Sequence, residues 1–115
     1  MKNEKLESLI KELKKKSIVE EVKIWKRIAT DLEKPSRNRR VVNLYKIDLN
    51  AKDNETIIVP GKVLATGDLN KKVTIAAYEI SKQAEDKIKN SGSKVVSIME
   101  LIQKNPKGNK VRILG

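Results

Sequence analysis

Residues 56–67, TIIVPGKVLATG, place two runs of β-forming residues on either side of a Pro-Gly pair. Thr56–Val59 and Lys62–Ala65 are predicted to be extended, because β-branched and aliphatic residues favour strands. Gly67-Asp68 marks the turn that closes the second run. Pro60-Gly61 predicts a tight bend in a strand, where glycine permits close approach of a neighbouring backbone.

The Gly61-Lys62 pair has a second interpretation as a phosphate-binding loop. That motif requires Gly at position 56 and Ser or Thr at position 63, where this chain has Thr56 and Val63. The strand bend is therefore the favoured interpretation.

The segment after this stretch alternates strand and helix signals. Ser81 and Ser97 are predicted helix caps, Gly92 supplies a left-handed residue that ends a helix, and Asn105-Pro106 ends the next. The predicted elements are a strand Val73–Ile80, a helix Lys82–Asn90, a strand Lys94–Ile98, a short helix from Ser97 to Lys104 and an extended stretch Val111–Leu114.

Two helices are predicted before residue 34. The first, capped by Asn3, has an apolar stripe with helical spacing at Leu6, Leu9, Ile10 and Leu13. Ser17 and Glu20 form a capping-box pattern that predicts the start of the second helix. That helix is expected to end near Glu33, before Pro35, and to bury Ile18, Val22, Trp25, Ala29 and Leu32.

The stretch that joins these helices to the first quoted strand is less regular. Val41–Leu44 is predicted to be extended, with Asn43 capping a helical turn that carries Leu44, Ile47 and Leu49. Asp53-Asn54 predicts a turn. The order of elements predicts a mixed α/β class, with two N-terminal helices packed on a small body of short strands and helices.

The length of 115 residues predicts one domain, because two cores of half this size would bury too little apolar surface. We divide it into a helix pair (1–33), a basic loop (34–46), an α/β body (47–105) and a basic tail (106–115). Without Cys the chain has no disulfide or thiolate, which favours a reducing compartment. Without a long apolar run or a signal peptide, the chain is expected in the cytosol and not in a membrane.

The net charge of +11 is concentrated in two short segments. Residues 34–46 carry five basic residues and no acid, and residues 102–115 carry four basic residues and no acid. Such a distribution predicts a polyanionic partner. Arg37, Arg39 and Arg40 are three of the five arginines, and their planar guanidinium groups suit phosphates and base edges.

Other residues have competing interpretations. Trp25 could stack on a base, but its place on the helical stripe favours the core. Tyr45 and Tyr78 remain open. The acidic residues near the basic regions favour solvated or capping roles over a metal site: Asp48, Asp53, Glu55 and Asp68. No cofactor is expected, and without His or Cys no catalytic constellation is evident.

Several motifs occur together in this chain: Ile58–Gly67, Val42–Ile47, Val73–Ala77, Ser81–Ala84 leading to Lys87-Ile88, and Asn105–Gly108 before Val111–Ile113. In order and spacing they resemble a known family, the large-subunit ribosomal protein eighteen-e of archaea and eukaryotes, a relative of bacterial large-subunit protein fifteen. The compact length is similar to the archaeal members. The chain departs from the family at Ser91-Gly92-Ser93, where relatives usually have paired glycines, and at Ala65, which is often Gly.

The resemblance implies a fold of irregular strand, strand, helix turns in a superhelix, and a non-catalytic place against large-subunit ribosomal RNA. It implies neighbouring large-subunit ribosomal proteins as further partners, a cytoplasmic ribosomal location, no small-molecule substrate and a monomer when isolated. From charge and position, we expect RNA contacts at Lys34, Ser36, Arg37, Asn38, Arg39, Arg40, Lys46, Lys62, Lys71, Lys72, Lys107, Lys110 and Arg112.

An alternative is a sequence-specific DNA-binding regulator that reads DNA with the N-terminal helix pair. It would need an uninterrupted basic stripe on the second helix. The acids in and before that helix argue against it: Glu20, Glu21, Asp31 and Glu33.

Overall fold

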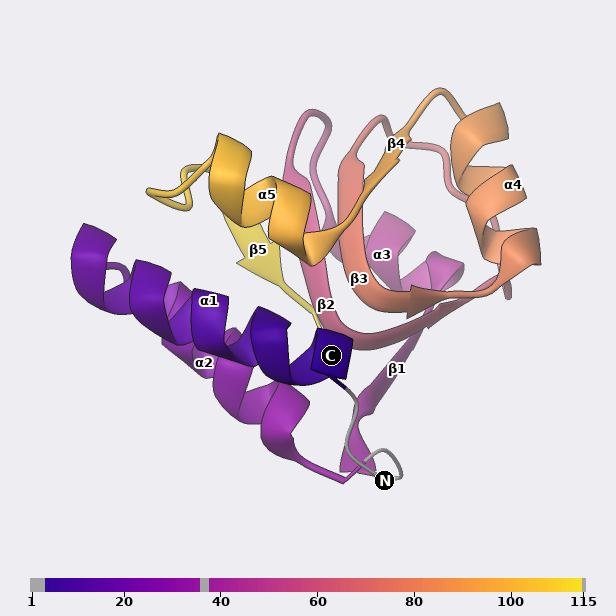
Figure 1. The fold of residues 1–115 in the computed structure, drawn as a ribbon. Coiled ribbons are helices and arrows are strands. Elements are labelled where there is room, and N and C mark those ends of the chain that lie inside the picture. The colour runs from indigo at the N-terminus through magenta and orange to yellow at the C-terminus, as the bar shows by residue number, and fades with distance from the viewer. Residues whose placement is uncertain (1–3, 36–37, 115) are drawn as a thin grey trace.

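The computed structural model describes residues 4–35 and 38–114, which form a mixed α/β fold that begins with two helices (Figure 1). Helix α1 spans Glu4–Glu20 and α2 spans Lys23–Glu33. The remaining elements are β1 (Arg40–Asn43), α3 (Leu44–Asn50), β2 (Thr56–Leu64), β3 (Thr74–Ile80), α4 (Lys82–Asn90), β4 (Lys94–Val96), α5 (Ile98–Lys104) and β5 (Val111–Ile113).

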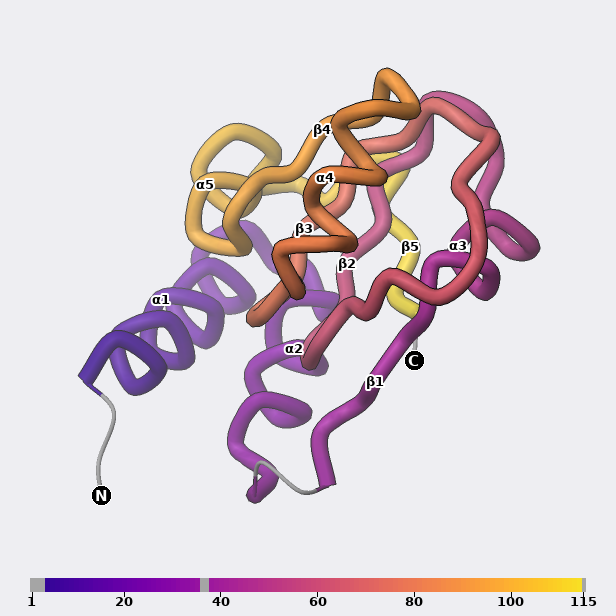
Figure 2. The backbone as a smooth tube through the Cα atoms, turned by 90° about the vertical axis from the view of Figure 1, so that its right-hand side faces the viewer, coloured from indigo at the N-terminus to yellow at the C-terminus, as the bar shows by residue number. Residues whose placement is uncertain are grey.

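The described strands form one parallel sheet around β2. Strand β3 follows β2 along one edge, and β4 pairs with the far edge of β3. The other edge of β2 is shared: β5 pairs with its first half and β1 with its second half. The chain end and residues of the basic loop therefore lie beside the same central strand (Figure 2).

Helices cover both faces of the sheet. Successive strand residues point to opposite sides, so each face of the sheet has its own cluster of buried residues. Ile57 and Ile75 pack with the buried residues of α3 and α4. Ile58 and Ala76 pack with the buried residues of α1, α2 and α5. In Figure 1 these three helices lie to the left of the sheet and α4 to the right. The α/β class and the N-terminal helix pair are confirmed.

Strand β2 continues through the Pro-Gly pair. The register against β3 shifts between Val59 and Lys62, because Pro60 has no amide hydrogen for the ladder. Gly61 lies opposite Arg40 of β1, and a Cβ atom at Gly61 would be 2.0 Å from the Arg40 carbonyl oxygen. The predicted close backbone approach is confirmed, and the neighbour is β1.

The predicted boundary between the N-terminal helices is wrong. Helix α1 continues to Glu20, and the chain turns at Glu21 with a φ of 56°. Instead of capping a new helix, the Ser17 hydroxyl donates a 2.8 Å hydrogen bond to the Val22 carbonyl. The stripe of α1 that contains Leu13 does not include Ile18, whose relative exposure is 78%.

The later helix caps are confirmed, and the side-chain cap predicted at Asn43 is wrong. The Ser81 and Ser97 side chains accept hydrogen bonds from the amides of Ala84 and Glu100. Asn43 precedes α3 without capping it through its side chain. Helix α3 carries Leu44, Ile47 and Leu49 as predicted; it buries Leu44 and Ile47, whereas Leu49 is 76% exposed.

Two lysines hold the segment 65–73 that connects β2 to β3. The Lys71 ammonium donates hydrogen bonds to the carbonyl oxygens of Asp48 and Ala51, at the end of α3. The Lys87 ammonium donates 3.0 Å hydrogen bonds to the carbonyls of Ala65 and Gly67. These hydrogen bonds attach the connection to the end of α3 and to α4.

Candidate nucleic-acid interface

The base of the basic loop is organised around a buried acid, Asp31 of α2. Its Oδ1 lies 3.2 Å from the Lys34 ammonium, and its Oδ2 lies 4.0 Å from Nε of Arg40. The Asp31 side chain is only 10% exposed. Since Lys34 follows α2 and Arg40 begins β1, these contacts join the end of α2 to the start of β1. Lys34 and Arg40, both predicted RNA contacts, thus have an internal acidic neighbour.

The other described loop residues have different surroundings. Arg39 is half-buried, with its guanidinium carbon 5.2 Å from the centre of the Tyr78 ring, which is a cation–π distance. Asn38 is exposed. Ser36 and Arg37 lie outside the described residues. Strand β1 and the start of helix α3 occupy the second half of segment 34–46. Lys46 lies in α3 and is half-buried.

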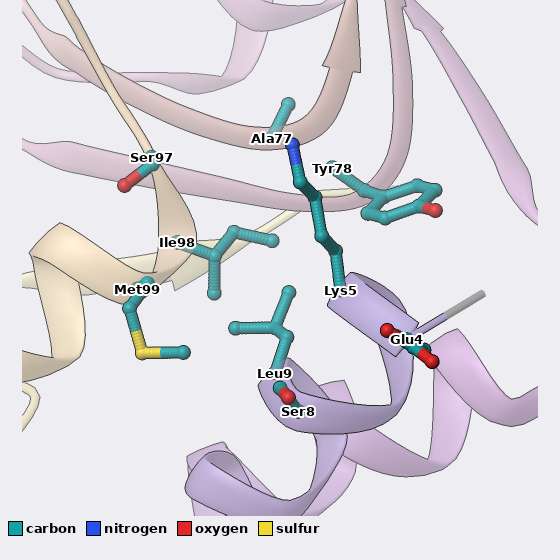
Figure 3. Close-up of a pocket in the computed structure, with 9 residues that line it drawn as sticks. All are labelled: Glu4, Lys5, Ser8, Leu9, Ala77, Tyr78, Ser97, Ile98 and Met99. Atoms are coloured by element: carbon teal, nitrogen blue, oxygen red, sulfur yellow. The ribbon is translucent and has the colours of Figure 1, made fainter.

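Tyr78 also lines an apolar hollow of about 590 Å³ between α1, β3 and α5. Figure 3 shows Leu9 and Ile98 pointing toward one another inside it, with Lys5 at its edge. Trp25, by contrast, is fully buried, which confirms its predicted core position.

Exposed lysines gather at the amino end of the sheet. Parallel pairing places Val111 and Thr74 opposite Thr56, and Lys94 opposite Thr74. Lys110 and Lys72 lie just before two of these strands, so the backbones of neighbouring lysines are one or two strand spacings, roughly 5 to 10 Å, apart. Lys72 and Lys94 also line a shallow hollow of about 260 Å³.

Lys94 was missed by the sequence analysis because segment 73–101 carries no net charge. Its position as the first residue of a strand, directly after the turn Ser91–Ser93, was the available signal. Strand registry alone brings it beside Lys72, from another segment.

The two other tail cations have acidic partners. The Lys107 ammonium lies 3.0 Å from Oε1 of Glu20, at the end of α1. Nε of Arg112 lies 3.2 Å from Oε2 of Glu55. The pKa of Glu55 is lowered from its ordinary value of 4.5, mainly by the 2.6 Å hydrogen bond from the Lys52 amide and further by Arg112. Arg112 therefore has a structural partner within the chain.

Lys62, Lys71 and Lys72, three of the expected RNA contacts, do not lie along one edge in the structure. Lys62 pairs in register with Glu79, near the end of β3, whereas Lys72 precedes the start of β3. Lys71 is directed inward to the carbonyls at the end of α3. Of the predicted cations, the described surface thus presents Lys62, Lys72 and Lys110 exposed and outside any ion pair, with Lys94 added.

The described residues were also searched for metal sites and for membrane-spanning helices. Within residues 4–35 and 38–114, no cluster of three or more His, Cys, Asp or Glu side chains is placed to hold a metal ion. No helix in this part of the chain is long and apolar enough to cross a membrane.

Comparison with known proteins gives a consistent result over almost the whole chain. Residues 3–96 match the family model described as ribosomal proteins 50S-L15 and 50S-L18e together with a 60S ribosomal protein. The chain is 48% identical over 112 residues to large ribosomal subunit protein eL18 of Methanoregula boonei, which covers 97% of this chain and 93% of the relative. The corresponding proteins of Pyrobaculum aerophilum and Methanothermobacter thermautotrophicus are 41% and 39% identical, again over 97% of this chain and over 92% and 93% of the relatives.

Proposed function

Since this chain belongs to the family of ribosomal proteins 50S-L15, 50S-L18e and a 60S ribosomal protein, we propose that it is a structural constituent of the large ribosomal subunit that binds large-subunit ribosomal RNA. The basic loop, residues 34–46, and the basic tail, residues 106–115, make the phosphate contacts. The protein acts without catalysis in the cytoplasmic ribosome, beside other large-subunit proteins.

One tertiary contact carries this proposal. The indole nitrogen of Trp25 donates a 2.7 Å hydrogen bond to the carbonyl oxygen of Pro106. Gly108 lies against Ile24 and Val22, so the start of the tail is seated on the first turn of α2. The last turn of α2 leads into the loop. Two acid-free basic segments that are distant in sequence are therefore attached to opposite ends of one helix.

The test is a salt titration of the affinity of the full chain for in vitro transcribed large-subunit ribosomal RNA. If about six phosphates are contacted, the slope of log affinity against log salt should be about −4 to −5, because each contact releases a counterion. An affinity independent of salt would contradict the proposal.

The variant R37Q/R39Q/K107Q/K110Q removes loop and tail charges but keeps Arg40 and Arg112 beside Asp31 and Glu55. We expect a clear loss of affinity with only a small decrease in unfolding temperature, because Arg39 loses its contact with Tyr78 and Lys107 its ion pair with Glu20. The matched control K11Q/K15Q/K82Q/K89Q removes the same charge elsewhere and should have a smaller effect. A defined motif selected from random duplex DNA would favour the DNA-binding alternative instead.

A further inference from the structure

The solvent-facing side of α2 is basic. The helix buries Trp25, Ile28, Ala29 and Leu32 against the sheet and α1. Its exposed positions include a stripe with the spacing i, i+3, i+4 and i+7, so the side chains follow one another along one face. The residues of this α2 stripe are Lys23, Lys26, Arg27 and Thr30.

The acids that interrupt this helix in the sequence do not interrupt the stripe in the structure. Glu20 belongs to α1 and pairs with Lys107. Asp31 is buried beside Lys34 and Arg40. The other two are also displaced: Glu33 pairs with Lys14 of α1 at 3.1 Å, and Glu21 lies in the turn between the helices.

The stripe cations are available for an external partner. Within the described residues, no ion pair or hydrogen bond engages the charged groups of Lys23, Lys26 or Arg27. Two shallow hollows lie along them. One, of about 450 Å³, is lined by Lys23, Lys26, Arg27, Thr30 and Asp31, and the other, of about 390 Å³, by Lys23, Ile24, Arg27 and Ile113.

The stripe lies between the two segments that the proposed function uses. The tail is seated on the first turn of α2 through Trp25, and Lys34 follows its last turn. The 11 residues of α2 span about 16 Å at 1.5 Å per residue. Figures 1 and 2 show α2 running from the region of α5 and the tail toward the start of β1.

The chemistry of the stripe suits a sugar-phosphate backbone. The Cβ atoms of Lys26 and Arg27 are each about 5–6 Å from that of Lys23. The Arg27 guanidinium can bind a phosphate through two donors. Thr30 adds a hydroxyl, which donates to the Lys26 carbonyl and can accept from a ribose hydroxyl. Protein interfaces favour aromatic residues and few charged ones at their centre, whereas these hollows are lined by three cations and no aromatic residue.

We propose that the α2 stripe is a third RNA-contact surface, which joins the basic loop and the basic tail into one continuous phosphate-binding face. This inference rests on the proposed function and extends it to residues outside the two acid-free segments.

The experiment compares two triple variants of the full chain in binding to in vitro transcribed large-subunit ribosomal RNA over a range of KCl concentrations. K23Q/K26Q/R27Q should lower the affinity at least about tenfold and make the salt slope shallower by about 2 to 3, the value for three lost phosphate contacts. The control K11Q/K15Q/K82Q removes the same charge from α1 and α4. It should leave the slope close to that of the unmodified chain.

Two further measurements separate binding from folding. The charge-conserving variant K23R/K26R/R27K should retain the original slope, and all three variants should keep their unfolding temperatures because the substituted side chains are exposed. In acetylation footprinting of the protein, bound RNA should protect Lys23 and Lys26 and leave Lys11 and Lys15 reactive.

Equal losses in both triple glutamine variants, or an unchanged slope in K23Q/K26Q/R27Q while the unmodified chain binds RNA, would overturn the inference alone. Absence of salt-dependent RNA binding by the unmodified chain would overturn the proposed function together with it.

Discussion

The indole Nε1 of Trp25 and the carbonyl oxygen of Pro106 are 2.7 Å apart, and this hydrogen bond spans 81 positions of sequence. Trp25 is fully buried in the core between the sheet and the N-terminal helices. The bond therefore fixes the segment before β5 to α2, and with it the position of the tail.

Replacing Trp25 with Phe should destabilise the protein and loosen the tail. The Pro106 carbonyl loses its donor, which costs about 1 to 3 kcal/mol when the group stays away from water. Urea unfolding followed by circular dichroism measures the change, and hydrogen exchange should increase at residues 107–112. The control Tyr45→Phe changes an exposed ring and should alter neither quantity; an unaltered exchange pattern in Trp25→Phe would argue against this anchoring role.

Lys71 and Lys72 are sequence neighbours with opposite expected roles. Lys71→Met removes two hydrogen bonds to the backbone at the end of α3, and should lower the free energy of unfolding by about 1 to 3 kcal/mol. Lys72→Met removes an exposed ammonium and should leave stability within about 0.5 kcal/mol, while weakening RNA binding. Chemical denaturation and RNA titration of the two variants, side by side, check this division. Reversed effects would contradict it.

Gly61 is required by the backbone of β1. In Gly61→Ala the new Cβ would be 2.0 Å from the Arg40 carbonyl oxygen, so β1 must shift, at a cost of about 1 to 3 kcal/mol or more. Gly92→Ala is the comparison. Its φ of 84° is strained for alanine, but only the Lys72 side chain lies nearby, at 3.6 Å, so a smaller cost of about 1 kcal/mol is expected. Thermal unfolding of both variants gives the order.

Glu55 should contribute to stability in a way that depends on acid pH. Because its folded-state pKa is below the ordinary value of 4.5, its contribution is fully present above that value and is lost as the pH falls through the lowered pKa. Glu55→Gln should therefore flatten the dependence of the unfolding free energy on pH in this acid range. Arg112→Gln keeps the main cause, the Lys52 amide, and should give an intermediate slope. Urea midpoints measured at several acid pH values provide the test, and identical slopes in all three proteins would refute it.

Much of the local structure followed from the sequence. The caps at Ser81 and Ser97, the left-handed Gly92 and the bend at Pro60-Gly61 were all predicted, because each depends on a few adjacent residues. The failure at Ser17 has a local competitor: its hydroxyl bonds to the Val22 carbonyl, which the closed turn at Glu21 brings within reach.

The candidate interface was harder to predict than the elements. Charge sums over segments identified the loop and the tail, but they could not assign an individual cation to solvent or to an internal partner. Lys71 binds backbone carbonyls from α3, and Arg112 binds Glu55, each about 20 or more positions away. The α2 stripe could not be predicted, because the sequence does not show that the acids near it are buried, paired with other segments or in the turn between the helices.

The sequence by itself determined the composition of the surface, the positions of most helices and strands, and the family, since these depend on residue type and on spacing within one element. Only the tertiary structure decided which cations are exposed together. Strand registry places Lys72, Lys94 and Lys110 at the amino end of the sheet. Packing buries Asp31, and Glu20 and Glu33 pair with cations outside the α2 stripe. The physical reason is that electrostatic interactions depend on distance in space, which distance along the chain does not fix.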